Sequence, residues 1–496
     1  MNKPQIELKD FSFTYDGCES PALKDVSLSV KEGEFILLTG PSGCGKTTLT
    51  RVLNGLIPDF FEGKAEGSAR VCDLNIPDAE TGDFSFHVGS VFQDPRSQFF
   101  TLHVKTEIPF PGENLGKEPN TLQESFLDAT ELFGLEPILN RSIFDLSSGE
   151  KQKVAIASVY VAGVEIFVLD EPSANLDGKS TEELKKVLKA LQDAGHTVIL
   201  SEHKLYYLKD LCDRVVLMKD GQIAEILTGS EFFKKDTAYL ESFGLRETDL
   251  GRLSPKAFLQ TPGTHTLSAG NLSFRYRGKT DLWKDCSFSV SGGQIIGILG
   301  ENGSGKSTLI RTLMGLNKPR TGKIFIDGAY AGKQKRREQS FYVMQDVDYQ
   351  LFAPSVFEEC LMGGDHSEAE QEKAAAVLKA FGLESFRDRH PTALSGGQKQ
   401  RLSIALSEMH AYPFLFFDEP TSGLDARNMR IVREELKTLA RKGACIFIIT
   451  HDYEFAADLF SALLVIEDGT VTFVDQESFK PEKLAGYFHI RGQSLT

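Results

Sequence analysis

The stretch of sequence that decides the fold is Gly40-Pro41-Ser42-Gly43-Cys44-Gly45-Lys46-Thr47-Thr48. It has the pattern G-x-x-x-x-G-K-[ST], preceded by an apolar run and followed by a segment suited to a helix. Strand, glycine loop and helix form the context expected of a phosphate-binding loop. Glycines let backbone N–H groups approach phosphate oxygens without a Cβ in the way. We therefore predict that Lys46 reaches the β- and γ-phosphates of a nucleotide and that the Thr47 hydroxyl binds Mg²⁺.

The same pattern returns 260 positions later in the chain, as Gly300-Glu301-Asn302-Gly303-Ser304-Gly305-Lys306-Ser307-Thr308. Other segments recur in the same order, at separations of 261 to 248 positions. These pairs are 12–15 with 273–276, 91–94 with 343–346, 146–149 with 394–397, 168–172 with 416–420, and His203 with His451. Fixed order with slowly changing separation indicates a tandem duplication. We predict a first domain at 4–235, a connector at 236–266 and a second domain at 267–496.

The alternation of apolar runs and helical patterns predicts an α/β fold with a parallel sheet in each copy. The runs 295–299, 414–417 and 446–449 are apolar throughout, as is typical of parallel strands buried on both faces. Helical patterns cover 181–192 and 429–441. The first forty residues of each copy read as short strands with turns, which predicts a small antiparallel β layer beside each core.

Charge and hydropathy narrow the class of protein. The net charge of −15 argues against a general nucleic-acid binder and against electrostatic attachment to anionic lipid. No stretch approaches the ~18 consecutive apolar residues of a membrane span, and the N-terminus lacks a signal-peptide apolar region. We expect a cytoplasmic chain, whose membrane role would require a separate spanning subunit. The seven cysteines form no C-x-x-C and have no His at zinc spacing, so we expect free thiols rather than metal ligands or disulfides.

Two acidic pairs carry the predicted hydrolytic chemistry. Asp170 and Asp418 end apolar strands, which places their carboxylates at the sheet edge where open α/β sheets bind ligands. Each can hold Mg²⁺ together with the Thr47 or Ser307 hydroxyl. The adjacent Glu171 and Glu419 are placed to act as general bases on an attacking water.

Three further matched pairs complete each predicted site. Gln93 and Gln345 follow short apolar runs, where an amide can bind both the metal's water shell and the lytic water. His203 and His451 also follow apolar runs, where an imidazole can donate to the γ-phosphate. Tyr15 and Tyr276 precede their phosphate loops by 31 and 30 residues, and each can stack on adenine.

A second anion site is predicted in each copy. Ser395-Gly396-Gly397-Gln398 precedes a helical pattern, and a serine with glycines at a helix N-terminus can bind phosphate. One phosphate loop needs no second anion site in its own copy, whereas two copies packed head-to-tail do. The first copy departs from the pattern, with Ser147, Ser148, Gly149 and Glu150. Ser148 adds a Cβ and Glu150 adds a charge, so we hypothesise that the site built on Lys306 and Glu419 hydrolyses more slowly.

The ordered motifs resemble those of ATPase subunits of ABC transporters with two fused nucleotide-binding domains. Walker A, Q-loop, signature, Walker B, D-loop (173–177 and 422–425) and H-loop match in order, twice, over nearly all 496 residues. The resemblance implies a helical subdomain in each copy and two ATP molecules sandwiched between the halves. Each ATP would contact one copy's Walker A and the other copy's signature, here Ser147 and Gly149 or residues 395–398.

A finer resemblance follows the two glutamines. Residues 93–100 and 345–352 are similar to the Q-D-P-x-x-Q-[LI]-F stretch of energy-coupling-factor importers, the cobalt and vitamin type, and 113–116 also fits that group. The resemblance implies a place at the cytoplasmic face of a membrane, with a transmembrane T component and a substrate-binding S component. The cargo would be a vitamin, a vitamin precursor or a transition metal.

Three alternative classes of protein match the sequence less well. A fused sugar-importer ATPase has similar length, but its second Walker A is typically degraded, whereas residues 300–308 are intact. A soluble tandem ABC protein acting on ribosomes or DNA is disfavoured by the acidic charge, the missing zinc cysteines and the missing long charged arm. A single-chain exporter would carry membrane spans.

Overall fold

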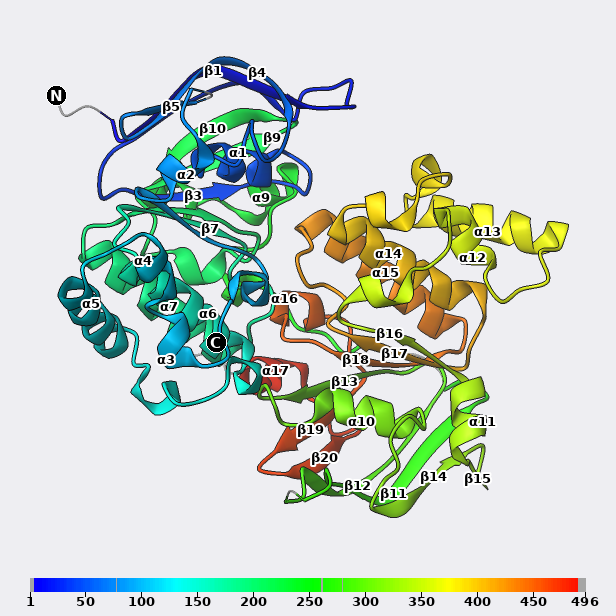
Figure 1. Cartoon of the computed structure of the whole chain (residues 1–496). Helices are drawn as coiled ribbons and strands as arrows, with labels where there is room; N and C mark the ends of the chain where they lie inside the picture. The colour runs from blue at the N-terminus through cyan, green and yellow to red at the C-terminus, as the bar shows by residue number, and fades with distance from the viewer. Residues whose placement is uncertain (1–3, 77, 260–261, 279, 489–496) are drawn as a thin grey trace. The chain divides into compact units, whose positions relative to one another are not determined.

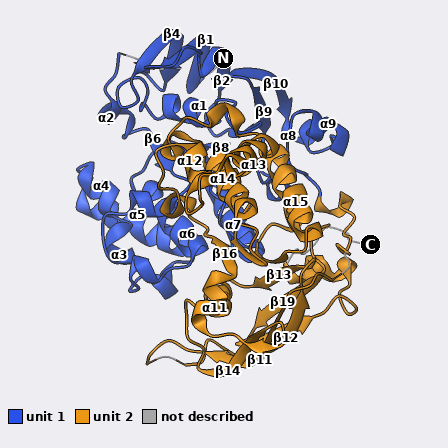
Figure 2. Ribbon diagram, turned by 90° about the vertical axis from the view of Figure 1, so that its right-hand side faces the viewer, with its two compact units in different colours: residues 1–249 blue, residues 250–496 orange. Residues whose placement is uncertain are grey.

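The computed structural model describes residues 4–76, 78–259, 262–278 and 280–488. The chain divides into two compact units, residues 1–249 and 250–496 (Figure 2). Parts of the predicted connector (260–261) and of the predicted second domain (279 and 489–496) lie outside the described residues, as does residue 77 of the first domain. In the part of the chain that is described, no helix combines the length and apolar character needed to cross a membrane.

The first unit contains an antiparallel sheet and a mainly parallel one (Figure 1). The antiparallel sheet has the order β2-β1-β4-β5, with bounds β1 Ile6–Tyr15, β2 Leu23–Val30, β4 Gly63–Val71 and β5 Leu74–Ile76. The second sheet has the order β10-β9-β3-β8-β7-β6, with bounds β3 Phe35–Thr39, β6 Val88–Val91, β7 Ile166–Asp170, β8 Thr197–Ser201, β9 Arg214–Lys219 and β10 Gln222–Thr228. Its strands are parallel except β10, which runs antiparallel to β9.

Helices α1 to α7 occupy connections between these strands, and α8 and α9 follow the last strand, β10. Their bounds are α1 Lys46–Leu53, α2 Thr81–Phe84, α3 Val104–Glu107, α4 Phe110–Asn114, α5 Pro119–Leu132, α6 Ser148–Val161, α7 Gly178–Asp193, α8 Gly229–Phe232 and α9 Thr237–Ser242. Helices α3 to α6 all lie between β6 and β7 in the sequence, and they form the helical subdomain of this copy (Figure 1).

The second unit repeats this plan. Its strands are β11 Thr266–Phe274, β12 Trp283–Ser291, β13 Ile295–Gly300, β14 Thr321–Ile326, β15 Ala329–Tyr330, β16 Ser340–Val343, β17 Phe414–Asp418, β18 Cys445–Ile449, β19 Ala462–Glu467 and β20 Thr470–Val474. They form one sheet of order β15-β14-β11-β12-β20-β19-β13-β18-β17-β16, because β12 pairs with β20 at Lys284 and Thr470. Its helices are α10 Lys306–Leu313, α11 Lys333–Glu338, α12 Val356–Leu361, α13 Glu368–Ala380, α14 Gly396–Met409, α15 Ala426–Arg441, α16 Tyr453–Ala456 and α17 Leu484–Tyr487.

The predicted fold class is confirmed in both units. The central strands β3, β8, β13 and β18 are buried along nearly their whole length, as expected of parallel strands covered on both faces. Helices α7 and α15 begin three residues before the predicted starts, because Asp177 and Asp425 cap them. Each carboxylate accepts a bond from the backbone N–H three residues on, at 2.7 Å.

The topology fixes where the functional residues meet. Since β3, β8, β7 and β6 are parallel, their carboxyl ends lie along one edge of the first unit's sheet. The segments that leave this edge begin at Gly40, Glu202, Glu171 and Phe92. The second unit brings Glu301, Thr450, Glu419 and Met344 to the corresponding edge.

Candidate functional site

The first phosphate loop joins β3 to α1 and closes on its own lysine. The Lys46 ammonium donates to the carbonyl oxygens of Gly40 at 2.9 Å and Pro41 at 3.2 Å. Gly45 caps α1 in the left-handed conformation, with φ of 103°, which favours glycine. A Cβ at Gly40 would lie 2.2 Å from the Met218 carbonyl oxygen, so only glycine fits where the loop passes β9.

The second phosphate loop, between β13 and α10, has the same construction. Lys306 Nζ donates to the carbonyl oxygens of Gly300 and Glu301, each at 2.9 Å. Gly305 caps α10 with φ of 98°, and a Cβ at Gly300 would lie 2.6 Å from the Ile466 carbonyl oxygen. Inside the loops, Cys44 N bonds Pro41 O and Ser304 N bonds Glu301 O, each at 3.2 Å. The two predicted loops therefore share one backbone conformation.

The two predicted adenine-stacking tyrosines lie beside these loops. The Tyr15 hydroxyl is 3.1 Å from Thr48 Oγ1, and the Tyr276 hydroxyl is 3.0 Å from Thr308 Oγ1. Tyr276 is 47% exposed, which leaves its ring accessible. In each unit, an aromatic residue at the end of β1 or shortly after β11 thus lies beside the start of the helix that follows the phosphate loop.

Asp170 and Asp418 stand at the carboxyl ends of β7 and β17, next to the phosphate-loop hydroxyls. Burial raises the pKa of Asp170, and the Glu171 charge adds to the rise, whereas the Ser201 and Thr47 hydroxyls and Lys46 oppose it. Burial also raises the pKa of Asp418, against hydrogen bonding from Ser307. Oδ1 of Asp170 is buried and makes no hydrogen bond to any described residue. A buried carboxylate oxygen of this kind, beside a hydroxyl, matches the oxygen ligands that Mg²⁺ takes.

In the first unit, the predicted general base Glu171 contacts both Gln93 and His203. Gln93 Nε2 donates to Glu171 Oε2 at 3.1 Å, and His203 Nε2 lies 3.2 Å from Glu171 Oε1. Glu171 has φ of 45°, a strained conformation for a residue with a Cβ and one that recurs at functional sites. The structure therefore brings together the glutamine, glutamate and histidine that the sequence pairs by position only.

The second unit repeats the carboxylate–imidazole pair. His451 Nε2 lies 3.5 Å from Glu419 Oε1, and the His451 backbone N–H donates to Glu419 Oε2 at 3.2 Å. Glu419 has φ of 51°, matching Glu171. Gln345 follows β16 as Gln93 follows β6, and its side chain is exposed.

The two signature segments are helix N-termini with the same cap. Ser147 and Glu150 form a capping box at α6, as Ser395 and Gln398 do at α14. Glu150 Oε2 accepts from Ser147 N at 2.7 Å, and Gln398 Oε1 accepts from Ser395 N at 2.9 Å. The Glu150 carboxylate thus makes the same capping hydrogen bond as the Gln398 amide oxygen.

Arg141 compensates the extra charge of the first signature. Its Nη1 donates to Glu150 Oε1 at 2.8 Å. Burial works to raise the pKa of Glu150, but bonds from Ser147 and the Arg141 charge outweigh it, so the pKa lies below its usual value. At the position of Ser148, a Cβ on the matching Gly396 would meet no described atom within 4 Å. The matching backbone position therefore leaves room for a Cβ within the unit, whereas the predicted effect of Ser148 on an approaching phosphate stays a prediction.

Sequence reasoning missed two buried glutamates that hydrogen-bond to the backbone of the loops after Gln93 and Gln345. The buried Glu107 accepts from the backbone N–H groups of Phe100 and Thr101, at 3.1 and 2.6 Å. The buried Glu359 accepts from Phe352 and Ala353, at 2.8 and 2.7 Å. The two glutamates occupy matching positions in the two copies, and this repeat could have identified them from the sequence.

Sequence reasoning also missed Glu202, which is fully buried beside His203. Its Oε1 accepts from the Tyr207 hydroxyl at 3.0 Å and from the Ser173 hydroxyl, and its Oε2 accepts from His203 N at 3.1 Å. Burial raises the pKa of Glu202 to about 7, against the Ser173 hydrogen bond. The second copy has Thr450 at the corresponding position, so the internal repeat gave no indication that Glu202 matters.

Comparisons with known proteins agree with this geometry. The family described as ABC transporter matches residues 23–174 and 283–422. A Treponema denticola protein, provisionally named an ABC transporter ATP-binding protein, is 42% identical over 472 residues, covering 94% of this chain and 96% of its own. A Bacillus subtilis protein, provisionally named the HMP/thiamine import ATP-binding protein YkoD, is 33% identical, covering 94% and 91%.

Among solved structures, a chain from ribosome-bound archaeal Pelota and ABCE1 has a TM-score of 0.67 at 22% identity, covering 92% of this chain and 77% of its own. At that identity the likeness concerns the fold alone. The matched family and the long relatives, together with two complete sets of phosphate loop, strand-end carboxylates and histidine, define the chain. It belongs to the ABC transporter family and is an ATP-hydrolysing ABC ATPase.

Proposed function

We propose that this chain powers a membrane importer of the energy-coupling-factor type, working at the cytoplasmic face of the membrane. One observation carries the proposal: both copies display an exposed aromatic side chain from a hydrogen-bonded loop that follows the Q-loop glutamine. Phe100 is 76% exposed and Phe352 is 70% exposed. Singly exposed apolar side chains are ordinary, but an aromatic at the matched position of both copies, on a loop held by hydrogen bonds each time, suits docking to a partner.

The motif residues explain how each loop is held. Gln98 Oε1 accepts from Phe92 N at 3.0 Å, and Gln350 Oε1 accepts from Met344 N at 2.8 Å. These bonds tie the second glutamine of the Q-D-P-x-x-Q-[LI]-F stretch back to the end of the strand. The buried Glu107 and Glu359 then fix the backbone of the aromatic residue itself. Because these loops directly follow Gln93 and Gln345, movement of a loop would displace the glutamine at the proposed site of hydrolysis.

One relative and the motif support a class of cargo. The Bacillus subtilis relative is named for HMP/thiamine import, which supports a vitamin or vitamin precursor as cargo, with a transition metal as the alternative within the same group. The partners would be a transmembrane T component and a substrate-binding S component.

We assign the following roles in hydrolysis. Glu171 and Glu419 accept a proton from the attacking water. His203 and His451 orient these carboxylates and donate to the γ-phosphate, while Lys46 and Lys306 bind the β- and γ-phosphates. Mg²⁺, held by Thr47, Asp170 and Gln93 or by Ser307, Asp418 and Gln345, would neutralise phosphate charge.

We further infer that each ATP is served by the phosphate loop of one copy and the signature of the other. The duplication supports this, because each copy carries one phosphate loop and a separate capped helix N-terminus at its signature. Ser395→Arg should then abolish hydrolysis at the Lys46 site without changing the first copy. The measurement is ATP turnover in a Lys306→Ala background. Unchanged turnover would contradict the shared arrangement.

The transport role is tested by co-purification from membranes of the native host. The wild-type chain should bring down a polytopic membrane protein, and Phe100→Asp with Phe352→Asp should lose it while still binding ATP. Tyr330→Asp, at an exposed aromatic on β15, is the matched control and should retain the partner. Co-sedimentation with ribosomes and no membrane partner would overturn the proposal in favour of a non-transport ATPase.

A further inference from the structure

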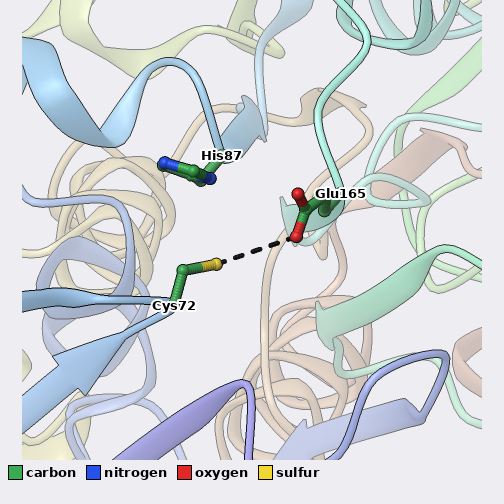
Figure 3. A group of neighbouring side chains, drawn as sticks. All are labelled: Cys72, His87 and Glu165. Carbon is green, nitrogen blue, oxygen red and sulfur yellow. Dashed lines mark hydrogen bonds between the residues drawn. The ribbon is translucent and has the colours of Figure 1, made fainter.

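Three side chains that bind metals well lie close together in the first unit (Figure 3). Cys72 lies in the turn between β4 and β5, His87 immediately precedes β6, and Glu165 immediately precedes β7. A thiol sulfur, an imidazole nitrogen and a carboxylate oxygen, one from each, all lie within 4.8 Å of one another. Among the described residues this is the one group of three or more such side chains that meets this criterion.

The cluster sits at the sheet edge opposite the predicted ATP site. Strands β6 and β7 are parallel neighbours, paired from Val88 with Ile166 to Val91 with Leu169. His87 and Glu165 stand at the starts of these strands, whereas Gln93 and Glu171 follow their ends. A ligand at the cluster would therefore be separate from the nucleotide.

The backbone under the cluster is already fixed. The His87 carbonyl oxygen accepts from the N–H groups of Glu165 at 3.1 Å and Ile166 at 3.0 Å. Cys72 N donates to the Gln5 carbonyl oxygen at 2.7 Å, and Gln5 Nε2 donates to Glu165 Oε2 at 3.0 Å. A ligand set whose supports are hydrogen-bonded in this way loses little entropy when it closes on an ion.

A carboxylate stands beside the thiol of this cluster. Cys72 Sγ lies 3.9 Å from Glu165 Oε2. A metal ion placed between these groups would offset the negative charge and take the place of the thiol proton, because a coordinating thiol is deprotonated.

We propose that Cys72, His87 and Glu165 bind one transition-metal cation, with Zn²⁺ the best match. One sulfur, one nitrogen and one oxygen ligand suit borderline-soft Zn²⁺, with water as the fourth ligand. Mg²⁺ and Ca²⁺ prefer all-oxygen sets. Bound there, the ion ties the β4–β5 turn of the antiparallel sheet to the starts of two core strands, a structural role independent of ATP hydrolysis.

The second unit supplies an internal comparison. Asp327 follows β14, as Cys72 follows β4. Gln339 precedes β16 and Pro413 precedes β17, as His87 and Glu165 precede β6 and β7. Proline offers no side-chain ligand, and Asp327 already binds His265 Nδ1 at 3.0 Å and Thr266 N at 2.8 Å. The three-ligand set thus belongs to the first copy.

No pattern in the sequence marks this cluster, and free thiols were expected. Cys72 and His87 are 15 positions apart, and Glu165 follows 78 positions later. These separations lie outside the short ligand spacings that mark zinc sites in a sequence.

Cobalt serves as a visible probe of the site. The full chain, stripped with a chelator and free of nucleotide and Mg²⁺, is titrated with Co²⁺. We expect a thiolate-to-cobalt charge-transfer band that saturates at one equivalent and is displaced by Zn²⁺. Cys72→Ser should lose the band, and Cys18→Ser, which removes an exposed thiol elsewhere, should keep it.

A second variant covers the case in which Cys72→Ser fails to fold. Glu165 is exposed, so Glu165→Gln should fold, retain ATP binding and lower Zn²⁺ affinity by a factor of about 10 or more, as loss of even a supporting group does. The proposal is overturned if wild type shows no charge-transfer band, if the band survives in Cys72→Ser, or if Glu165→Gln binds Zn²⁺ as wild type does.

Discussion

His203 Nε2 lies 3.2 Å from Glu171 Oε1, and His451 Nε2 lies 3.5 Å from Glu419 Oε1. Both glutamates have left-handed backbone conformations, so the two copies hold the same carboxylate–imidazole pair in the same way. A difference in hydrolysis between the copies can then arise from the residues around this pair, and the signature segments, with Ser148 and Glu150 in place of Gly396 and Gln398, are one place where the sequences differ.

The first prediction concerns unequal hydrolysis. If the first signature serves the site of Lys306 and Glu419, that site is the slower one. Glu171→Gln should therefore remove more of the steady-state ATPase activity than Glu419→Gln, each costing about 10²–10⁴-fold at its own site. The two variants are compared at saturating ATP. Equal residual activity, or more activity in Glu171→Gln, would refute the asymmetry.

The second prediction concerns the Arg141–Glu150 pair. Arg141→Ala leaves the Glu150 carboxylate uncompensated at a helix N-terminus that we propose binds phosphate, so ATPase activity should fall severalfold. In a Glu150→Gln chain, which has the amide of the second copy, the same Arg141→Ala change should have little effect. Residues in contact typically couple by about 0.5–3 kcal/mol. A double-mutant cycle with no coupling would show that Arg141 does not act through Glu150.

The third prediction concerns Tyr342, whose hydroxyl donates to Asp418 Oδ2 at 3.0 Å. Burial raises the pKa of Asp418 and this bond opposes the rise, so Tyr342→Phe should raise it further. Because a protonated carboxylate cannot hold Mg²⁺, Mg·ATP binding should weaken, and more at pH 6 than at pH 8. Binding is measured in a Lys46→Ala background, which isolates the second phosphate loop.

Ser90 is the matched control for Tyr342, since it occupies the corresponding position in β6 and is hydrogen-bonded to Asn54 at 2.9 Å. Ser90→Ala, tested in a Lys306→Ala background, should leave the pH dependence of Mg·ATP binding unchanged. A Tyr342→Phe effect that is the same at both pH values would remove the link to Asp418.

The fourth prediction uses the pH dependence of folding. The pKa of Glu202 is raised to about 7 in the folded chain, from an ordinary value of 4.5. Between these values the folded state binds more protons than the unfolded state, so this group makes the free energy of unfolding fall as pH rises. Relative to Glu202→Gln, wild type should lose up to about 3 kcal/mol between pH 5 and pH 8. Melting of both proteins across this range checks it, and a constant difference would contradict it.

The sequence predicted what local chemistry dictates. The glycines of each phosphate loop, the carboxylates at the strand ends and the serine caps of the signature helices each leave a short pattern, because a few adjacent residues must build the site together. The duplication strengthened each pattern, and it allowed Gln93, Glu171 and His203 to be grouped before their contacts were known.

Partners brought together by tertiary structure left no such pattern. Arg141 neutralises Glu150 from nine positions away, Glu107 anchors the aromatic loop from inside the core, and Cys72 meets Glu165 across two sheets. Residue type alone placed the Ser148 Cβ where phosphate would approach, and this stays a prediction, whereas the room for a Cβ within the unit, seen at the matching Gly396, could be judged only from the packed structure. The room around a side chain and the neutralisation of a charge depend on how the unit packs, so they could not be predicted from the sequence.

The sharpest test of the hydrolytic roles is the double variant Glu171→Gln with Glu419→Gln, assayed in the same preparation for nucleotide binding and for ATP hydrolysis. We predict that Mg·ATP still binds both phosphate loops while turnover falls by about 10²–10⁴-fold, as loss of a general base does. Turnover at the wild-type rate with both glutamates replaced would contradict these roles.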